Sequence, residues 1–447
     1  MRQSSNRPRR GAIVALLVAL LAAPAGAQLP APPGLPSLPG SIGLPGAPSV
    51  PVVRDTLQTL GGVTDLRKLR LRDLIRQSRD SIDVDARGAP VVRGELLAVA
   101  PSAESLSRAK AVGFTILRET TIEGADLRLV ALAIPRGLDA RQAIKRLRKA
   151  DPGGDYDFNH IYSSAGDARP TTRPQLVKSG ASAPSCGPGT RIGLVDTGVD
   201  TRHPALAGAR IELRGFAPGG VKPMPHGTAA ASLLVGRAGV FHGAAPGATL
   251  LAADVYGGGP TGGSTDAILR GLGWLAGSDV TVINISLVGP PNAAMKAVID
   301  RLTARGVIIV AAVGNDGPAA PPLYPASYPG VVAVTAVDGR NRVLLEASRA
   351  LHVDFAAPGA DMAAAGTGGD YLSVRGTSFA APLVAGRLAG LRSAPGPAGA
   401  RAAIDALTRD ARDLGPPGVD RTYGRGLVAS DLRTPPRAVG ASTAVLR

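Results

Sequence analysis

The chain is poor in cysteine, in aromatic residues and in long apolar runs. Cys186 is the only cysteine, which excludes an intrachain disulfide and a zinc site built from several cysteines. Aromatic residues make up 3% of the 447 residues, and the chain has neither an aromatic RNA-binding signature nor zinc-finger spacing. If the protein is exported, its stability must come from packing and not from cross-links.

Positive charge, in contrast, is abundant. The formal net charge is +16, a balance that can indicate nucleic-acid or anionic-surface partners. The arginines are spread along the whole chain, and this favours a solvated, Arg-rich surface. We therefore expect no nucleic-acid partner.

The N-terminus has the organisation of a targeting segment. Four arginines among the first ten residues precede a short apolar run from Ala12 to Ala23, and Ala25-Gly26-Ala27 is a small-x-small cleavage site. A membrane anchor is the alternative, but spanning needs about 20 apolar residues. We expect a signal peptide over 1–27 and export to the periplasm or the outside. No cysteine stands directly after the run, so a bacterial lipid anchor is excluded.

Two further segments precede the first folded pattern. Residues 28–64 are rich in Pro, Gly and small apolar side chains, which is typical of a linker without a core. Leucines at near-helical spacing among basic residues then predict a helix over 65–79. Packing of this helix on its neighbour is favoured, and contact with a membrane surface is the alternative.

The next segment alternates strand and helix patterns in the order β-α-β-β-α-β, which is the ferredoxin-like arrangement. Asp139 is the expected cap of the second helix. The domain is expected over 65–162, including the leading basic helix, and the polar, Pro- and Ser-rich residues 163–189 are expected to be a linker. The elements are predicted at 91–100, 102–113, 114–122, 126–135, 139–150 and 155–162.

From Thr190 onward, continuous apolar runs of strand length alternate with helical stretches. Such runs suit strands buried on both faces, and the alternation predicts an α/β fold, a parallel sheet with helices on both sides. Ligands bind such sheets outside the carboxyl ends of the strands. The predicted strands are 191–196, 248–256, 280–287, 307–313 and 331–337.

Four polar residues follow these strands or begin helices. Asp196 ends a strand before Thr-Gly, His226 begins an apolar helix, Asn315 follows a strand, and Ser378 lies in a Gly-Thr-Ser turn that opens a long helix. Taken alone, each has a structural reading as a turn Asp, an ordinary His, a turn Asn or an N-cap Ser. Together they supply a nucleophile, a base, a carboxylate that orients the base, and an oxyanion donor.

These motifs resemble the subtilisin-like serine proteases, or subtilases. The resemblance runs from about Thr190 to Leu432 and rests on VDTGVDTRHPAL, HGT, INISL, AAVGNDGP, FAAPG and GTSFAAP, with DRTYGRGLV similar to the family's C-terminal end. The Asp, His, Ser order is that of subtilisin. We expect a subtilisin-like peptidase domain over 190–435 and a tail over 436–447.

The resemblance implies a secreted serine endopeptidase that acts on polypeptides. It assigns the attack to Ser378, the proton transfer to His226 and the orientation of the imidazole to Asp196. Asn315 and the Ser378 backbone N–H would stabilise the oxyanion.

The resemblance also implies that substrates bind as an added strand through backbone bonds. Leu323 matches the floor of the specificity pocket, where it would narrow the pocket toward small or modest apolar side chains. The positions that match the backbone-binding segments are Ser286, Leu287, Val288, Gly289, Ala312, Val313 and Gly314.

The stretch Val235–Phe241 stands where the family has a calcium loop. It has no oxygen-bearing side chain, and calcium sites are built from oxygens. We expect this site to be absent, no metal ligands among the site residues and no required cofactor, while other calcium sites stay open.

Residues 90–162 resemble the family's inhibitory propeptide. This implies a zymogen whose N-terminal domain inhibits the enzyme until the chain cuts itself between Ser163 and Gly189. A permanently attached accessory domain is the rival. Two other readings of the whole chain stay open at this point, a catalytically silent binding module of the same fold and a basic protein attached to a membrane or envelope surface through residues 65–79.

Overall fold

The computed structural model describes residues 71–164, 167–170, 186–187 and 189–440. The predicted signal peptide, the linker 28–64, the first part of the basic helix and the end of the tail lie outside these residues. Within the predicted basic helix, residues 71–77 are helical.

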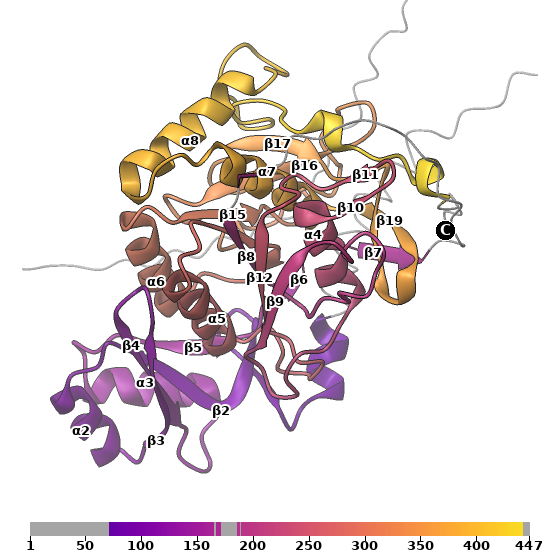
Figure 1. The fold of residues 1–447 in the computed structure, drawn as a ribbon. Helices are drawn as coiled ribbons and strands as arrows, with labels where there is room; N and C mark the ends of the chain where they lie inside the picture. The colour runs from indigo at the N-terminus through magenta and orange to yellow at the C-terminus, as the bar shows by residue number, and fades with distance from the viewer. Residues whose placement is uncertain (1–70, 165–166, 171–185, 188, 441–447) are drawn as a thin grey trace, which may run out of the picture. The chain divides into compact units, whose positions relative to one another are not determined.

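The N-terminal domain is an antiparallel sheet with two helices on one face (Figure 1). Its strand order is β5-β2-β4-β3, and β1 pairs with the first residues of β2 on the edge opposite β5. This is the ferredoxin-like order that the sequence pattern predicts. The elements are β1 (Ile82–Val84), β2 (Pro90–Val99), α2 (Ala103–Ala111), β3 (Thr115–Ile122), β4 (Leu127–Ala133), α3 (Ala140–Ala150) and β5 (Tyr156–His160).

Local signals fix the two helices of this domain. The Ser102 hydroxyl accepts from the Ser105 backbone N–H at the start of α2. Asp139 and Gln142 form a reciprocal capping box at the start of α3. Leu106 of α2 and Leu147 of α3 then pack on β2 and β4.

The second domain is built on seven parallel strands in the order β17-β16-β15-β13-β8-β12-β9. Most of their residues are buried, as expected for a sheet covered on both faces. The strands are β8 (Arg191–Asp196), β9 (Arg210–Gly215), β12 (Thr249–Asp254), β13 (Val282–Ile285), β15 (Ile308–Ala312), β16 (Val332–Val337) and β17 (Phe355–Pro358).

Alternate residues of each strand point to opposite faces, and the two faces form separate cores. Leu194 of β8 packs with α4 and α7, whereas its neighbour Val195 packs with α5 and α6. The helices of this domain are α4 (Pro225–Val235), α5 (Thr265–Gly277), α6 (Ala293–Ala304), α7 (Thr377–Leu391) and α8 (Gly396–Asp410), with short 3₁₀ turns at Thr367–Gly369, Ser430–Leu432 and Pro436–Val439.

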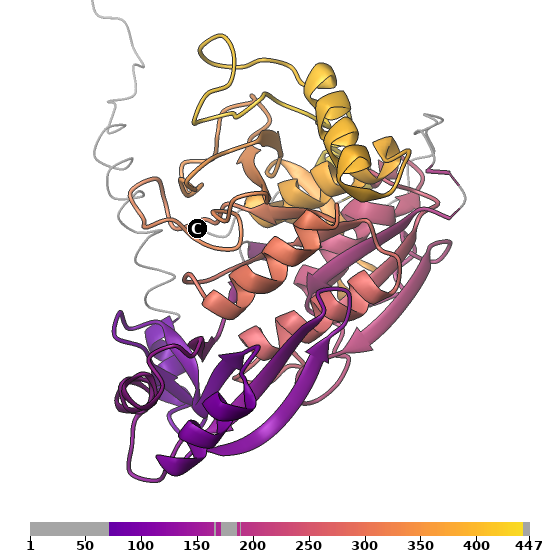
Figure 2. The ribbon, with the colours of Figure 1, turned by 90° about the vertical axis from the view of Figure 1, so that its left-hand side faces the viewer.

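The faces of α5 and α6 that point away from the parallel sheet pack against the sheet of the N-terminal domain, as Figure 2 shows. Leu97, Ile122 and Leu129 of that sheet share one apolar core with Leu272 and Leu275 of α5. The two domains therefore bury apolar surface against each other.

Three small sheets complete the fold. Two of their strands, β6 and β7, lie inside the segment expected to be a linker, and both pair with the second domain. Among the described residues no helix is both long and apolar enough to cross a membrane. The strands of these sheets are β6 (Ser163–Ser164), β7 (Asp167–Pro170), β10 (Arg237–Ala238), β11 (Phe241–His242), β14 (Leu287–Val288), β18 (Met362–Ala365) and β19 (Tyr371–Arg375).

Candidate active site

Asp196 is the last residue of β8 and is fully buried at the carboxyl edge of the parallel sheet. Its two carboxylate oxygens lie 2.8 and 2.9 Å from Nδ1 of His226. The Thr197 backbone N–H also donates to Oδ1, at 2.6 Å. A buried carboxylate is stable only when it is paired in this way.

His226 is the second residue of α4, after Pro225, which suits the first turn of a helix. Because a carboxylate only accepts hydrogen bonds, Nδ1 carries the proton and Nε2 carries a lone pair. Nε2 is buried and has no hydrogen-bond partner among the described residues. The imidazole thus presents an unused base.

Gly227 lets α4 approach the end of β8 closely. A Cβ on Gly227 would lie 2.2 Å from the Thr197 carbonyl oxygen, closer than any side chain can lie. The Gly227 N–H donates to the Thr197 hydroxyl at 2.8 Å. The Gly of HGT and the Thr of VDTG therefore set the distance between Asp196 and His226.

Ser378 is the second residue of α7 and is fully buried. Its hydroxyl donates to the Ser286 carbonyl at 3.2 Å, and the Ser286 hydroxyl donates to the Ser378 carbonyl at 2.9 Å. The ring of the next residue, Phe379, lies 5.3 Å from the His226 ring. Gly376 has φ 139°, which bends the chain into the helix. The helix N-terminus offers free N–H groups at this point.

Asn315 follows β15, and its side chain is held from the same helix start. Oδ1 of Asn315 accepts from the Thr377 backbone N–H at 3.1 Å, which leaves the amide nitrogen as the donor at the other end. The Thr377 hydroxyl accepts from the Gly314 N–H at 3.1 Å. Sequence reasoning missed Thr377, although its place before Ser378 in GTS was the available signal.

Leu323, Val288 and Gly314, three of the residues predicted to bind substrate, lie close together. A Cβ on Gly314 would lie 2.5 Å from Cδ1 of Leu323 and 3.4 Å from Cγ1 of Val288. Gly314 also has φ +99°, a conformation that favours glycine. Leu323 is buried against this wall.

The segment from Ser286 to Gly289 borders a strand of the chain itself. Leu287 and Val288 pair with Ser164 and Ser163 of β6 in antiparallel register. Gly289 exchanges backbone hydrogen bonds with Tyr324 at 2.9 and 3.0 Å. The structure therefore brings part of the predicted substrate-binding set to an extended segment.

Ala312 and Val313 lie differently. Ala312 pairs with Val334 of β16, and the Val313 N–H donates to the Val334 carbonyl at 3.1 Å. These contacts belong to the central sheet, so the Val313 N–H is committed to the fold.

Tyr162, which sequence reasoning did not single out, precedes β6 and is buried against this region. A Cβ on Gly289 would lie 2.5 Å from the Tyr162 ring, and the Tyr162 hydroxyl donates to the Pro290 carbonyl at 2.9 Å. Burial raises the pKa of Tyr162 well above its ordinary value, so the hydroxyl stays a donor. The Tyr162 N–H donates to Gly263 at 2.8 Å.

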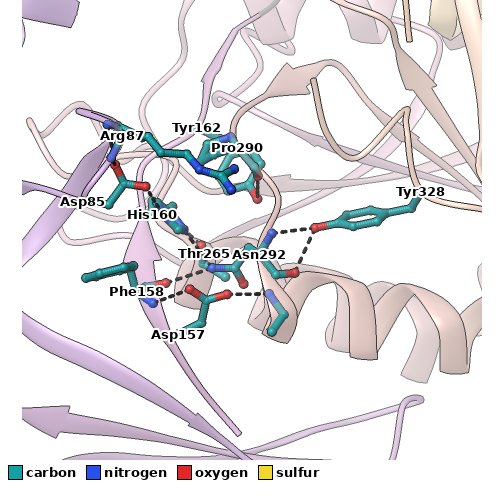
Figure 3. Close-up of polar contacts among 12 residues, drawn as sticks. Asp85, Arg87, Asp157, Phe158, His160, Tyr162, Thr265, Pro290, Asn292 and Tyr328 are labelled. Atoms are coloured by element: carbon teal, nitrogen blue, oxygen red, sulfur yellow. Dashed lines mark hydrogen bonds and ion pairs between the residues drawn. The ribbon is translucent and has the colours of Figure 1, made fainter. Parts of the chain in front are cut away.

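Strand β5 contacts the N-termini of two helices of the second domain, and Figure 3 shows the polar groups around it. Asp157 accepts from the Ala293 N–H at the start of α6, at 2.6 Å. Asn159 accepts from the Asp266 N–H at the start of α5, at 3.0 Å. An acceptor, and above all an anion, is stabilised at a helix N-terminus.

His160 is buried next to these helix ends. Its Nε2 lies 3.3 Å from Asp85, and its Nδ1 lies 3.0 Å from the Asn292 amide nitrogen (Figure 3). The same Asn292 amide donates to the Phe158 carbonyl at 2.9 Å, and Thr265 donates to the His160 carbonyl at 3.1 Å. The contact between the domains therefore combines an apolar core with paired polar groups.

The described part of the chain contains no group of three or more His, Cys, Asp or Glu side chains placed to hold a metal ion. Within Val235–Phe241, residues Arg237 and Ala238 form a two-residue hairpin strand with Phe241 and His242.

Comparison with known proteins identifies the family to which the chain belongs. The sequence profile of the Subtilase family matches residues 187–426. The chain belongs to the subtilase family. It is a subtilisin-like serine endopeptidase, an enzyme that hydrolyses polypeptides.

Two relatives illustrate the similarity. Subtilisin E of Bacillus subtilis is 32% identical over 264 residues, which cover 56% of this chain and 67% of the relative. An alkaline protease of Alkalihalobacillus alcalophilus is 35% identical over 288 residues, covering 60% of this chain and 72% of the relative.

Among solved structures, fervidolysin from Fervidobacterium pennivorans, a keratinolytic enzyme related to subtilisin, aligns with a TM-score of 0.63 at 22% identity. The alignment covers 79% of this chain and 62% of the fervidolysin chain. At this identity the likeness concerns the fold, and it extends over more of this subtilase than the family profile does.

Proposed function

We propose that this subtilase is exported and cleaves peptide bonds through an Asp196–His226–Ser378 triad and an acyl-enzyme. The observation that carries the proposal is the buried hydrogen bond from His226 to Asp196, which leaves Nε2 free beside the residue that follows Ser378. This arrangement supports a base at His226 that Asp196 orients.

The chemistry follows from these positions. His226 Nε2 accepts the proton of the Ser378 hydroxyl while that oxygen attacks the substrate carbonyl, and the imidazolium is stabilised by Asp196. The tetrahedral oxyanion accepts hydrogen bonds from the Asn315 amide and the Ser378 N–H. His226 then gives the proton to the leaving amine, and a water molecule hydrolyses the acyl-enzyme by the reverse path.

The enzyme is made as a self-processing zymogen, with its N-terminal domain as the inhibitor. Two observations support this: β6 pairs with the predicted substrate-binding strand β14, and β5 binds the N-termini of α5 and α6. The chain is cut between Ser163 and Gly189, after removal of a signal peptide over 1–27. Catalysis needs no cofactor and no calcium at Val235–Phe241.

The deciding experiment compares wild type with Ser378→Ala by intact mass after expression. Wild type should lose residues 1–162, whereas Ser378→Ala should keep residues 90–162 covalently attached. Ser430→Ala, a change at an exposed serine, is the matched control and should process normally. If wild type and Ser378→Ala both keep these residues, self-maturation is wrong.

Labelling by a fluorophosphonate tests the triad separately. Wild type should react at Ser378, and Ser378→Ala should not. A wild-type chain that folds but takes no label would instead be a catalytically silent binding module.

A further inference from the structure

The backbone carbonyl of Ser378 lacks its usual partner within helix α7. In an α-helix each carbonyl accepts a hydrogen bond from the N–H four residues further on. For Ser378 that residue is Pro382, which lies inside α7 and has no N–H to donate. The hydroxyl of Ser286 donates to this carbonyl instead, at 2.9 Å. The proposed nucleophile is therefore bound by a neighbouring segment at the point where a regular helix would bind it to its own next turn.

Ser286 and Ser378 are joined by a second hydrogen bond in the opposite direction. The Ser378 hydroxyl donates to the backbone carbonyl of Ser286 at 3.2 Å, and both residues are fully buried. Ser286 directly follows the last residue of β13. The two bonds therefore fasten the first turn of α7 to the central sheet.

Asn284 sets the direction of the Ser286 hydroxyl. A carbonyl only accepts hydrogen bonds, so the hydrogen of this hydroxyl points to Ser378, and its oxygen is left to accept from another donor. The amide nitrogen of Asn284 is that donor, at 2.9 Å. A relay of hydrogen bonds with a single direction thus runs from Asn284 through Ser286 to Ser378.

The surroundings of Asn284 show that its amide is costly to the fold. Asn284 is fully buried on β13, and its register partners are Leu194 of β8 and Val310 of β15. Residues in register share a face of the sheet, and this is the face on which α7 packs. Oδ1 of Asn284 is buried and has no hydrogen-bond partner in the described part of the chain. A buried acceptor without a partner is destabilising, so stability alone favours an apolar side chain at this position.

We propose that Asn284 and Ser286 are positioning residues of the candidate active site. Through the Ser378 carbonyl they hold the first turn of α7, and with it the Ser378 hydroxyl, in the place from which it attacks. Pro382 belongs to the same device, because it prevents the helix from taking up this carbonyl. The proposal rests on the proposed endopeptidase function.

The test measures kcat and KM of the full-length chain on one internally quenched peptide, the best substrate of wild type from a peptide library. Active sites are counted by the fluorophosphonate label, so that incomplete processing does not enter kcat. Ser286→Ala should lower kcat about 10-fold to 100-fold, because a small misplacement of a reacting group costs up to that much. KM should stay within about twofold, since the relay does not bind the substrate in its ground state.

Ser232→Ala is the matched control. Ser232 is also fully buried, and its hydroxyl also donates to a backbone carbonyl, that of Ala229 in α4, at 2.8 Å. This variant should lose stability and keep the wild-type kcat. Tm is measured on the fluorophosphonate-labelled chain, which cannot digest itself.

Asn284→Leu separates position from stability. It removes the donor to Ser286 together with the unpartnered acceptor. We expect kcat to fall about fivefold, the worth of one hydrogen bond, while Tm stays at or above the wild-type value. A side chain that served the fold alone would show the reverse, a lower Tm with an unchanged kcat.

The double variant of Ser286→Ala with Pro382→Ala tests the connection to the sheet. The second change gives α7 a backbone N–H that can donate to the Ser378 carbonyl. Tm should therefore recover from the value of Ser286→Ala. The kcat should stay low, because the carbonyl is then held by the helix and not by the sheet.

The outcomes separate the two proposals. Equal kcat values for Ser286→Ala and Ser232→Ala, or a wild-type kcat in Asn284→Leu, overturn the positioning role. Recovery of both kcat and Tm in the double variant also overturns it, since any donor to the Ser378 carbonyl would then be sufficient. If wild type cleaves no peptide of the library and takes no fluorophosphonate label, the endopeptidase function itself fails.

Discussion

The N-terminal region meets the protease domain in two places that are built in different ways. At β5, side chains make the contact: Asp157 and Asn159 bind the N-termini of α6 and α5. At β6 and β7, the contact is backbone pairing with β14 and β19. Backbone pairing accepts many sequences, whereas capping of two helices depends on particular side chains. The comparison teaches that the first contact depends on particular side chains of this chain, whereas the second uses backbone groups that any extended segment carries.

The largest expected effect concerns the candidate active site, which lies next to the second contact. Asn315→Ala removes the proposed oxyanion donor, and kcat should fall about 10²–10³-fold, the loss that follows removal of the matching donor in subtilisin. Steady-state peptide kinetics measure it. Thr377→Val keeps the backbone N–H that holds Asn315 and should lower kcat far less. Equal losses for the two variants would mean that Asn315 acts only through the fold.

The next effect concerns Tyr162, which lies between the two contacts. Replacing a buried aromatic ring by Ala costs about 3–5 kcal/mol, so in Tyr162→Ala the cleaved N-terminal domain should dissociate at least about 100-fold faster. Tyr162→Phe loses only the hydroxyl bond to Pro290, worth about 1 kcal/mol. The lag before peptide activity appears measures dissociation. If the lag of Tyr162→Ala equals that of wild type, Tyr162 does not contribute to the binding of the N-terminal domain.

A smaller effect should follow from the helix-capping contact. Asp157→Ala removes an anion from the N-terminus of α6, a loss of about 1 kcal/mol. The activation lag should shorten about fivefold, while kcat/KM for peptides should stay at its wild-type value because Asp157 does not reach the cleft. A fall in kcat/KM would show that the contact at β5 also affects catalysis, and the two contacts would then not be independent.

The smallest effect is a pH dependence. Burial alone raises the pKa of Asp85, but hydrogen bonds from His160, Ala89 and Arg87 outweigh burial and hold this pKa below its ordinary value. A carboxyl whose pKa is lowered on folding stabilises the fold above its unfolded pKa of about 3.9 and loses that contribution as the pH falls further. In a Ser378→Ala background, Asp85→Asn should therefore lower Tm at pH 7.

The same comparison at lower pH checks the sign of this effect. The difference in Tm between Asp85→Asn and its Ser378→Ala parent should shrink as the pH falls through about 4, and thermal unfolding by circular dichroism measures it. A difference that grows on acidification would show that Asp85 is not the ionised partner.

The parallel sheet and the ferredoxin-like domain could be predicted because their strands carry their own apolar pattern. Ile192–Val195, for example, are buried on both faces and read as a continuous apolar run. The motif residues Asp196 and His226 could likewise be placed at the sheet edge, because parallel strands end on one side.

The strands β6 and β7 could not be predicted in the same way. Ser163 and Ser164 have no strand pattern, since their pairing is supplied by β14 and not by a buried face of their own. The role of Thr377 was signalled only by its place before Ser378, because a backbone N–H that orients Asn315 leaves no trace in residue type. Hydrophobic periodicity in the sequence does not predict contacts that backbone groups make between distant segments.

The bond from the Ser378 hydroxyl to the Ser286 carbonyl has a kinetic consequence. A serine hydroxyl turns between staggered positions within nanoseconds, so this bond does not slow a change of its hydrogen-bond partner. Asp196 and His226 are already joined, and Asn315 is already held. In the proposed zymogen these groups are already assembled, so the rate of activation would be the rate at which the N-terminal region leaves the protease domain.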